Sequence, residues 1–67
     1  MLTREEIKRS LTTAVSLLTR SKQEDERTCD ELYAKGDHSS AVIYSGIVEA
    51  LDYALDLLKP ILAEMDK

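Results

Sequence analysis

An apolar repeat between Tyr44 and Met65 constrains the fold of this chain more than any other feature of its sequence. Apolar side chains recur there in steps of three and four residues, at Tyr44, Ile47, Leu51, Ala54, Leu58, Ile61 and Met65. This spacing places them along one side of an α-helix, as in a coiled-coil seam. Flanking apolar residues stand on both sides of the seam, at Val48, Leu55 and Leu62 and at Ile43, Ala50 and Leu57. The apolar surface is therefore wider than contact with one neighbouring helix requires.

A capping box marks the start of an earlier helix. Thr3 and Glu6 are spaced so that each side chain can satisfy a free backbone N–H at the other's position, and Leu2 precedes them where a hydrophobic staple belongs. Apolar residues then recur at helical spacing, at Ile7, Leu11, Ala14, Val15 and Leu18. We therefore expect a helix that begins at about residue 4.

The segment from Thr19 to Thr28 is entirely polar and has two interpretations. It contains no Gly or Pro and is rich in good helix formers. Lys22 and Glu26 are four residues apart, the spacing at which helical side chains meet. We favour one continuous helix over residues 4–35. The alternative is a break near residues 20–24, which would give a three-helix arrangement.

Gly36 predicts a turn over residues 36–38. A glycine can adopt the left-handed conformation that ends a helix, and Asp37 can cap the helix that follows. That second helix is expected over residues 39–66, with a kink at Pro60 or, alternatively, with a short separate helix after it. Because the turn is short, the two helices should be antiparallel neighbours.

The predicted fold is an all-α antiparallel helical hairpin, one domain over residues 1–67, and it needs a partner. Ordering so short a chain costs roughly 1.5 kcal/mol per residue, and Cys29, the only cysteine, cannot form an internal disulfide. The polar segment 19–28 lies opposite residues 44–53, so the first helix cannot cover the apolar face of the second. We expect a dimeric four-helix bundle or a higher homo-oligomer. Its predicted interface consists of Tyr44, Ile47, Val48, Leu51, Ala54, Leu55, Leu58, Ile61 and Leu62.

The remaining face of the second helix is acidic. Glu49, Asp52 and Asp56 follow one another at helical spacing. We interpret them as a solvated face and not as a metal site, because carboxylate-bridged metal bundles use Glu-x-x-His pairs that this chain lacks. With the outward-facing Tyr53 they form the predicted surface for a protein partner. A net charge of −4 disfavours nucleic acid as a partner. No base–nucleophile pair stands out, so we predict no catalytic residue and no cofactor.

The turn offers a second hypothesis, a site between subunits for a small anionic, nucleotide-like ligand. Free backbone N–H groups, hydroxyls and an imidazole gather at this helix start. Ordinary capping also explains these residues and is the interpretation we favour. The candidate ligand-binding residues are Asp37, His38, Ser39, Ser40 and Tyr44, joined by Arg20 or Arg27 from a neighbouring chain.

These observations favour a non-enzymatic interaction module, a small homo-oligomer that acts by binding a protein partner. A regulatory or inhibitory accessory protein, of the kind that phages and mobile elements encode, fits its size and acidity. The first residues lack the apolar core and cleavage site of a signal peptide. The longest uncharged run, residues 38–48, is too short to span a bilayer. We therefore expect a cytoplasmic protein without membrane contact.

Overall fold

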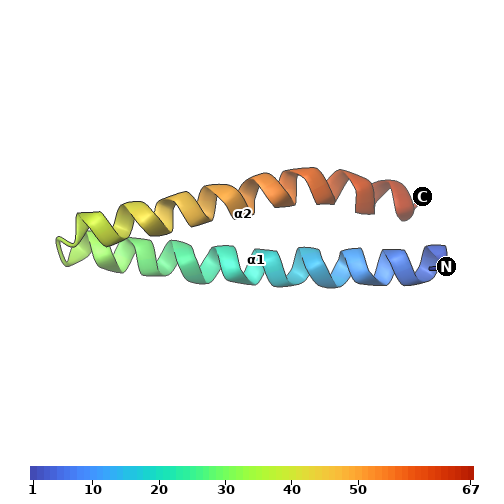
Figure 1. Cartoon of the computed structure of the whole chain (residues 1–67), viewed down its shortest axis with the longest axis horizontal. Helices are drawn as coiled ribbons and strands as arrows, with labels where there is room; N and C mark the ends of the chain where they lie inside the picture. The colour runs from blue at the N-terminus through green and yellow to red at the C-terminus, as the bar shows by residue number, and fades with distance from the viewer.

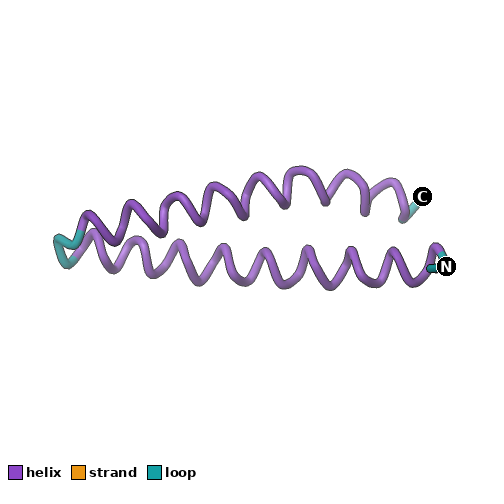
Figure 2. Tube along the Cα trace, in the orientation of Figure 1, coloured by secondary structure: helices purple, strands orange, loops and turns teal.

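Two long α-helices lie side by side and antiparallel in the computed structural model, which describes all 67 residues. Helix α1 spans Arg4–Ala34 and helix α2 spans His38–Met65. A short turn joins them, and the two ends of the chain lie together at the other end of the hairpin (Figures 1 and 2). The predicted all-α helical hairpin is confirmed, and each helix boundary falls within one residue of its predicted position.

The capping box that was predicted for the first helix is present. The Thr3 hydroxyl accepts a hydrogen bond from the Glu6 backbone N–H at 3.1 Å, and the Glu6 carboxylate accepts one from the Thr3 N–H at 3.2 Å. The polar segment 19–28 continues as helix without a break, as we favoured. Within it the Thr28 hydroxyl donates to the backbone carbonyl of Glu24, one turn earlier, at 3.1 Å.

The turn is a Schellman motif around Gly36, which has a φ of +82°. The Gly36 N–H donates to the carbonyl of Tyr33, and the Asp37 N–H donates to that of Leu32. These are the two hydrogen bonds that end a helix when the residue after its cap is left-handed. Asp37 then caps α2, because its carboxylate accepts a hydrogen bond from the Ser40 N–H at 3.3 Å.

Helix α2 continues through Pro60 and does not end there. A separate terminal helix, the alternative from the sequence, is therefore wrong. Proline removes one backbone hydrogen bond and clashes with the preceding turn, so bending is expected. The α2 ribbon is bowed, whereas α1 is nearly straight (Figure 1).

The hairpin buries very few of its residues. Only Cys29, Ala41 and Leu55 are buried. The radius of gyration is 15.2 Å, whereas a compact chain of this length would have one of about 11 Å. Two helices alone meet along a single strip, so most large apolar side chains remain at least partly exposed.

Contacts between the helices fix their register. The Cys29 thiol donates to the Ala41 carbonyl at 3.3 Å near the turn. Farther along, Lys22 meets Asp52 at 2.8 Å. At a rise of about 1.5 Å per residue along both helices, this register places the midpoint of α1 opposite Leu55.

Candidate interaction surface

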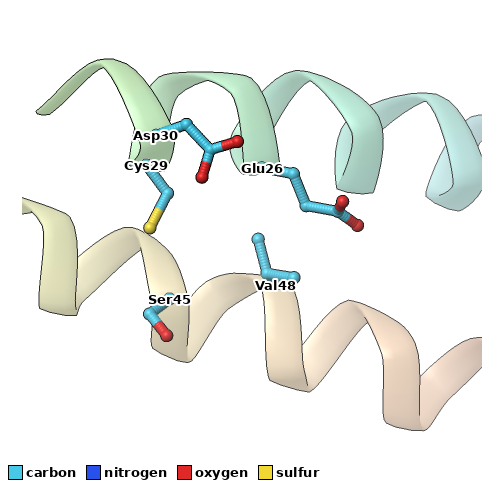
Figure 3. Close-up of a pocket in the computed structure, with 5 residues that line it drawn as sticks. All are labelled: Glu26, Cys29, Asp30, Ser45 and Val48. Carbon is cyan, nitrogen blue, oxygen red and sulfur yellow. The ribbon is translucent and has the colours of Figure 1, made fainter. Parts of the chain in front are cut away.

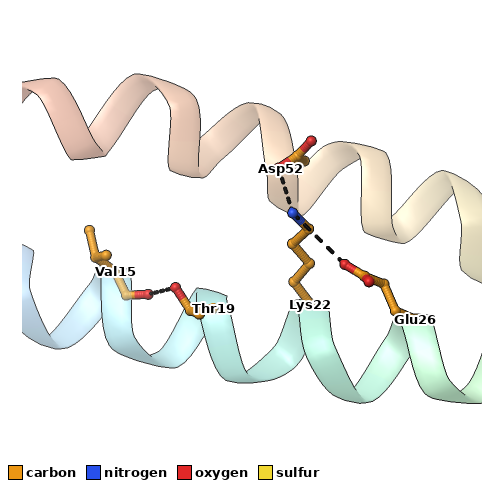
Figure 4. Close-up of polar contacts among 5 residues, drawn as sticks. All are labelled: Val15, Thr19, Lys22, Glu26 and Asp52. Atoms are coloured by element: carbon orange, nitrogen blue, oxygen red, sulfur yellow. Dashed lines mark hydrogen bonds and ion pairs between the residues drawn. The ribbon is translucent and has the colours of Figure 1, made fainter.

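Ion pairs between α1 and α2 hold one side of the hairpin, which we call the polar side. The Lys22 ammonium lies 2.8 Å from the Asp52 carboxylate and 3.8 Å from that of Glu26 (Figure 4). Near the chain ends, Lys8 pairs with Asp66 at 2.8 Å. Residues seven apart share a helix face. The two lysines are fourteen apart along α1, and Asp66, which follows the last residue of α2, is fourteen after Asp52. The two pairs therefore lie on the same side.

A shallow hollow of about 120 Å³ opens on the polar side near the turn (Figure 3). Two carboxylates, of Glu26 and Asp30, stand at its rim, and the Cys29 thiol points toward α2. That thiol is engaged with the Ala41 carbonyl. Small-molecule sites usually enclose about 300 Å³ or more, so the hollow is too small to be the principal functional site.

The strip of α2 that packs against α1 is itself a heptad repeat. It consists of Ala41, Tyr44, Val48, Leu51, Leu55, Leu58, Leu62 and Met65, all buried or half-buried. Their burial comes from α1, the only element that lies against α2. Six of the nine residues predicted for the oligomer interface therefore face α1 at least in part. Of the other three, Ala54 is half-buried at the edge of this strip, and Ile47 and Ile61 are exposed.

Opposite the polar side, α2 leaves an apolar surface uncovered. Ala54 follows Asp52 by two residues, a rotation of about 200° around the helix, so it lies on the side away from Asp52. Ile47 and Ile61 share its heptad position and expose 41% and 50% of their surface. The neighbouring heptad position is also apolar and exposed, with Ile43, Ala50 and Leu57.

Helix α1 extends this apolar surface only in the half near the termini. Leu11 and Leu18 share a heptad position with Asp25, and Ala14 shares one with Ser21. The surface of α1 therefore changes from apolar to polar toward the turn. We define the apolar face of the hairpin as Ile7, Leu11, Ala14 and Leu18 of α1 with Ile43, Tyr44, Ile47, Ala50, Leu51, Ala54, Leu57, Leu58 and Ile61 of α2.

The predicted interface did not include every residue of this face. It omitted the four residues of α1, together with Ile43, Ala50 and Leu57. A signal for the α1 residues was present, because they are spaced by four, three and four positions in the sequence. The sequence could not show that they lie on the same side of the hairpin as Ile47 and Ile61.

Of the residues predicted to bind a protein partner, one is engaged within the hairpin and three are free on its surface. Asp52 is engaged by Lys22 in the hairpin, whereas Glu49 and Asp56 form no ion pair and are exposed. The Tyr53 side chain points outward and exposes 67% of its surface. The outer surface of α2 thus presents one free aromatic ring beside two free carboxylates.

The ion pair between Lys22 and Asp52 predicts a pH dependence of stability. The hydrogen bond and charge of Lys22 hold the pKa of Asp52 below its usual range, and Asp52 raises the pKa of Lys22. The depressed pKa stabilises the fold above about pH 4 and this contribution is lost in acid. The raised pKa stabilises it below about pH 10 and this contribution is lost in alkali.

We therefore expect Asp52→Asn to lower the urea midpoint at pH 7, with the difference from wild type vanishing as the pH falls toward 2. Urea unfolding followed by circular dichroism across this range would measure it. Asp30→Asn is the control, because Asp30 is exposed and forms no ion pair. Equal midpoints for wild type and Asp52→Asn at pH 7 would contradict the prediction.

Two of the turn residues proposed for an anionic ligand, Asp37 and His38, make structural contacts through their side chains. Asp37 caps α2 through the Ser40 N–H, which agrees with the capping interpretation. The His38 ring lies beside the Tyr33 ring, with centroids 5.6 Å apart. Ser39 is exposed in the first turn of α2. None of these residues lines a hollow of the surface.

The other members of that set lie elsewhere on the hairpin. Arg20 is two residues before Lys22 and so points to the outer side of α1, and Arg27 shares its heptad position. Tyr44 lies at the edge of the apolar face. One chain therefore does not bring the candidate ligand-binding residues together.

Comparison with known proteins gives no relative for this arrangement, since no family model, curated protein or solved structure matches the chain. No group of three or more His, Cys, Asp or Glu side chains is placed to hold a metal ion. Neither helix combines the length and the apolar character needed to cross a membrane.

Proposed function

We propose that this chain is a non-enzymatic interaction module that works as a homo-oligomer and acts by binding a protein partner. The observation that carries the proposal is the apolar face, whose residues the hairpin leaves exposed or only half-buried. A dimeric four-helix bundle is the simplest assembly that covers such a face.

The exposed area of the chain supports this proposal. The accessible surface is 5074 Å². A compact monomer of 7.5 kDa would expose about 4,200 Å². The excess of roughly 800 Å² matches the area that each partner loses in a protein interface of standard size. A second copy could therefore remove from water about the surface that the hairpin leaves in excess.

The chemistry of the polar groups supports a role in binding and not in catalysis. The Cys29 thiol, the strongest potential nucleophile, is buried and donates to a backbone carbonyl. The single imidazole, His38, lies against Tyr33, and the thiol's hydrogen bond goes to the Ala41 carbonyl and not to this ring.

The partner surface in this proposal is the outer surface of α2. In a bundle that covers the apolar face, Tyr53, Glu49 and Asp56 remain accessible. An exposed tyrosine beside carboxylates suits a partner with a basic or amide-rich surface. A regulatory or inhibitory accessory protein would act through such a surface.

Native mass spectrometry of the full chain at micromolar concentration tests the proposal. We expect a single species at twice the chain mass of 7.5 kDa or at a higher multiple, without an added mass. A monomer at this concentration would overturn the self-association. A retained small anionic molecule would instead favour the ligand-binding hypothesis.

A further inference from the structure

We propose that two copies pack with their apolar faces together and with their turns at opposite ends, so that the two-fold axis passes beside Ala54. This arrangement rests on the self-association proposed above and specifies its geometry. The alternative dimer places both turns at the same end. The two dimers bring different residues into contact across the interface. The residues along the apolar face therefore favour one dimer over the other.

The apolar seam of α2 matches itself when it is reversed about Ala54. Leu51 stands three residues before Ala54 and Leu58 four after it. Ile47 and Ile61 stand seven residues on either side. In a two-fold interface residue i meets j and j meets i. Two antiparallel copies of α2 therefore pair leucine with leucine and isoleucine with isoleucine, around a small central residue that permits close approach.

The alignment of the two helices within one hairpin is consistent with a two-fold axis beside Ala54. The midpoint of α1 lies opposite Leu55, next to Ala54, as the pair of Lys22 and Asp52 requires. An axis beside Ala54 therefore lets α1 overlap with its copy along nearly its full length, and it sets residues 43–65 of α2 opposite the same residues of the other copy. No part of the apolar face is then left uncovered at either end.

The two dimers set the polar residues of α1 against different neighbours. With both turns at one end, α2 of one copy lies over α1 of the other, which sets Ile47 and Leu51 against Ser21 and Asp25. With the turns at opposite ends, α2 lies over α2, and Leu58 and Ile61 cover them. In this arrangement α1 also lies over α1, which brings Asp25 of each copy near Ala14 of the other, whereas the leucines and isoleucines of α2 meet one another.

The charge of Asp25 also favours the dimer with its turns at opposite ends. Asp25 is half-buried and no hydrogen bond or ion pair within the chain engages its carboxylate. With both turns at one end, two such carboxylates share one level of the bundle core, and like charges removed from water repel strongly. With the turns at opposite ends they are separated by about 15 Å along the axis, beyond the Debye length of about 8 Å at physiological salt.

Distances between spin labels test the arrangement. In a Cys29→Ala background, Ser39→Cys carries a label at the turn and Tyr53→Cys carries one near the middle of α2; both native side chains are exposed. We expect a separation of about 45 Å between the two turn labels, from the helical rise, and less than about 30 Å between the two middle labels, from the width of a four-helix bundle.

The two labels distinguish the possible failures. A short distance for both labels would show a dimer with its turns at the same end and would overturn this arrangement alone. The absence of dipolar coupling for both labels would show a monomer and would overturn the self-association itself. A circular dichroism spectrum equal to that of the native chain confirms that each labelled variant is folded.

Discussion

Replacing Ile47 with Asp should convert the proposed dimer into monomers. Ile47 exposes 41% of its surface in the single hairpin, so the substitution removes few contacts within one chain. In the proposed dimer it is buried at two symmetric positions. The 41% of each isoleucine that is still exposed in the hairpin accounts for roughly 0.6–1.2 kcal/mol of the about 1.5–3 kcal/mol for full burial, and burying a carboxylate at each position costs several kcal/mol more. We expect dissociation to be favoured by a factor of about 10² to 10⁴, measured by sedimentation velocity over a series of concentrations.

Val42→Asp is the matched control for this prediction. Val42 is also a β-branched apolar residue of α2 and exposes 61% of its surface. It shares a heptad position with Glu49 and Asp56 and lies outside the apolar face. We expect its sedimentation to equal that of wild type. Equal dissociation of both variants would mean that added charge, and not the apolar face, controls the assembly.

Local features of the fold could be predicted from the sequence because they depend on residues within a few positions of one another. Thr3 and Glu6 form their capping box within one turn of helix. Gly36 and Asp37 set the turn through backbone hydrogen bonds to the preceding residues. Short-range hydrogen bonding leaves few alternatives for such segments.

The rotation of α2 about its own axis could not be predicted in the same way. Apolar residues occupy several adjacent heptad positions of α2, so more than one face could pack against α1. The sequence placed Val48, Leu55 and Leu62 beside the main seam, whereas the structure places them within the strip that faces α1. The ion pair between Lys22 and Asp52 joins residues thirty positions apart, and no local pattern reveals it.

That rotation also determines where the candidate surface lies. Because Val48 and Leu55 pack inward, Ile47 and Ile61 are left on an open side of the hairpin. The sequence indicated an excess of apolar surface on α2. Leu11 and Leu18 lie beside this apolar surface of α2 only because of the alignment of the two helices, and the sequence alone did not give that alignment.

Leu55→Ala should be the most destabilising single substitution within one hairpin. Leu55 exposes 2% of its surface and is the only large side chain among the three buried residues. Truncating a buried leucine costs about 2–5 kcal/mol, a large part of the stability of so small a fold. We expect this loss in the free energy of unfolding, measured in urea by circular dichroism. One fixed chain concentration is used, because the proposed self-association would make stability depend on concentration. Leu17→Ala makes the same change at an exposed site of α1 and should cost less than about 1 kcal/mol. An equal loss in both variants would show that Leu55 is not the centre of the contact between the helices.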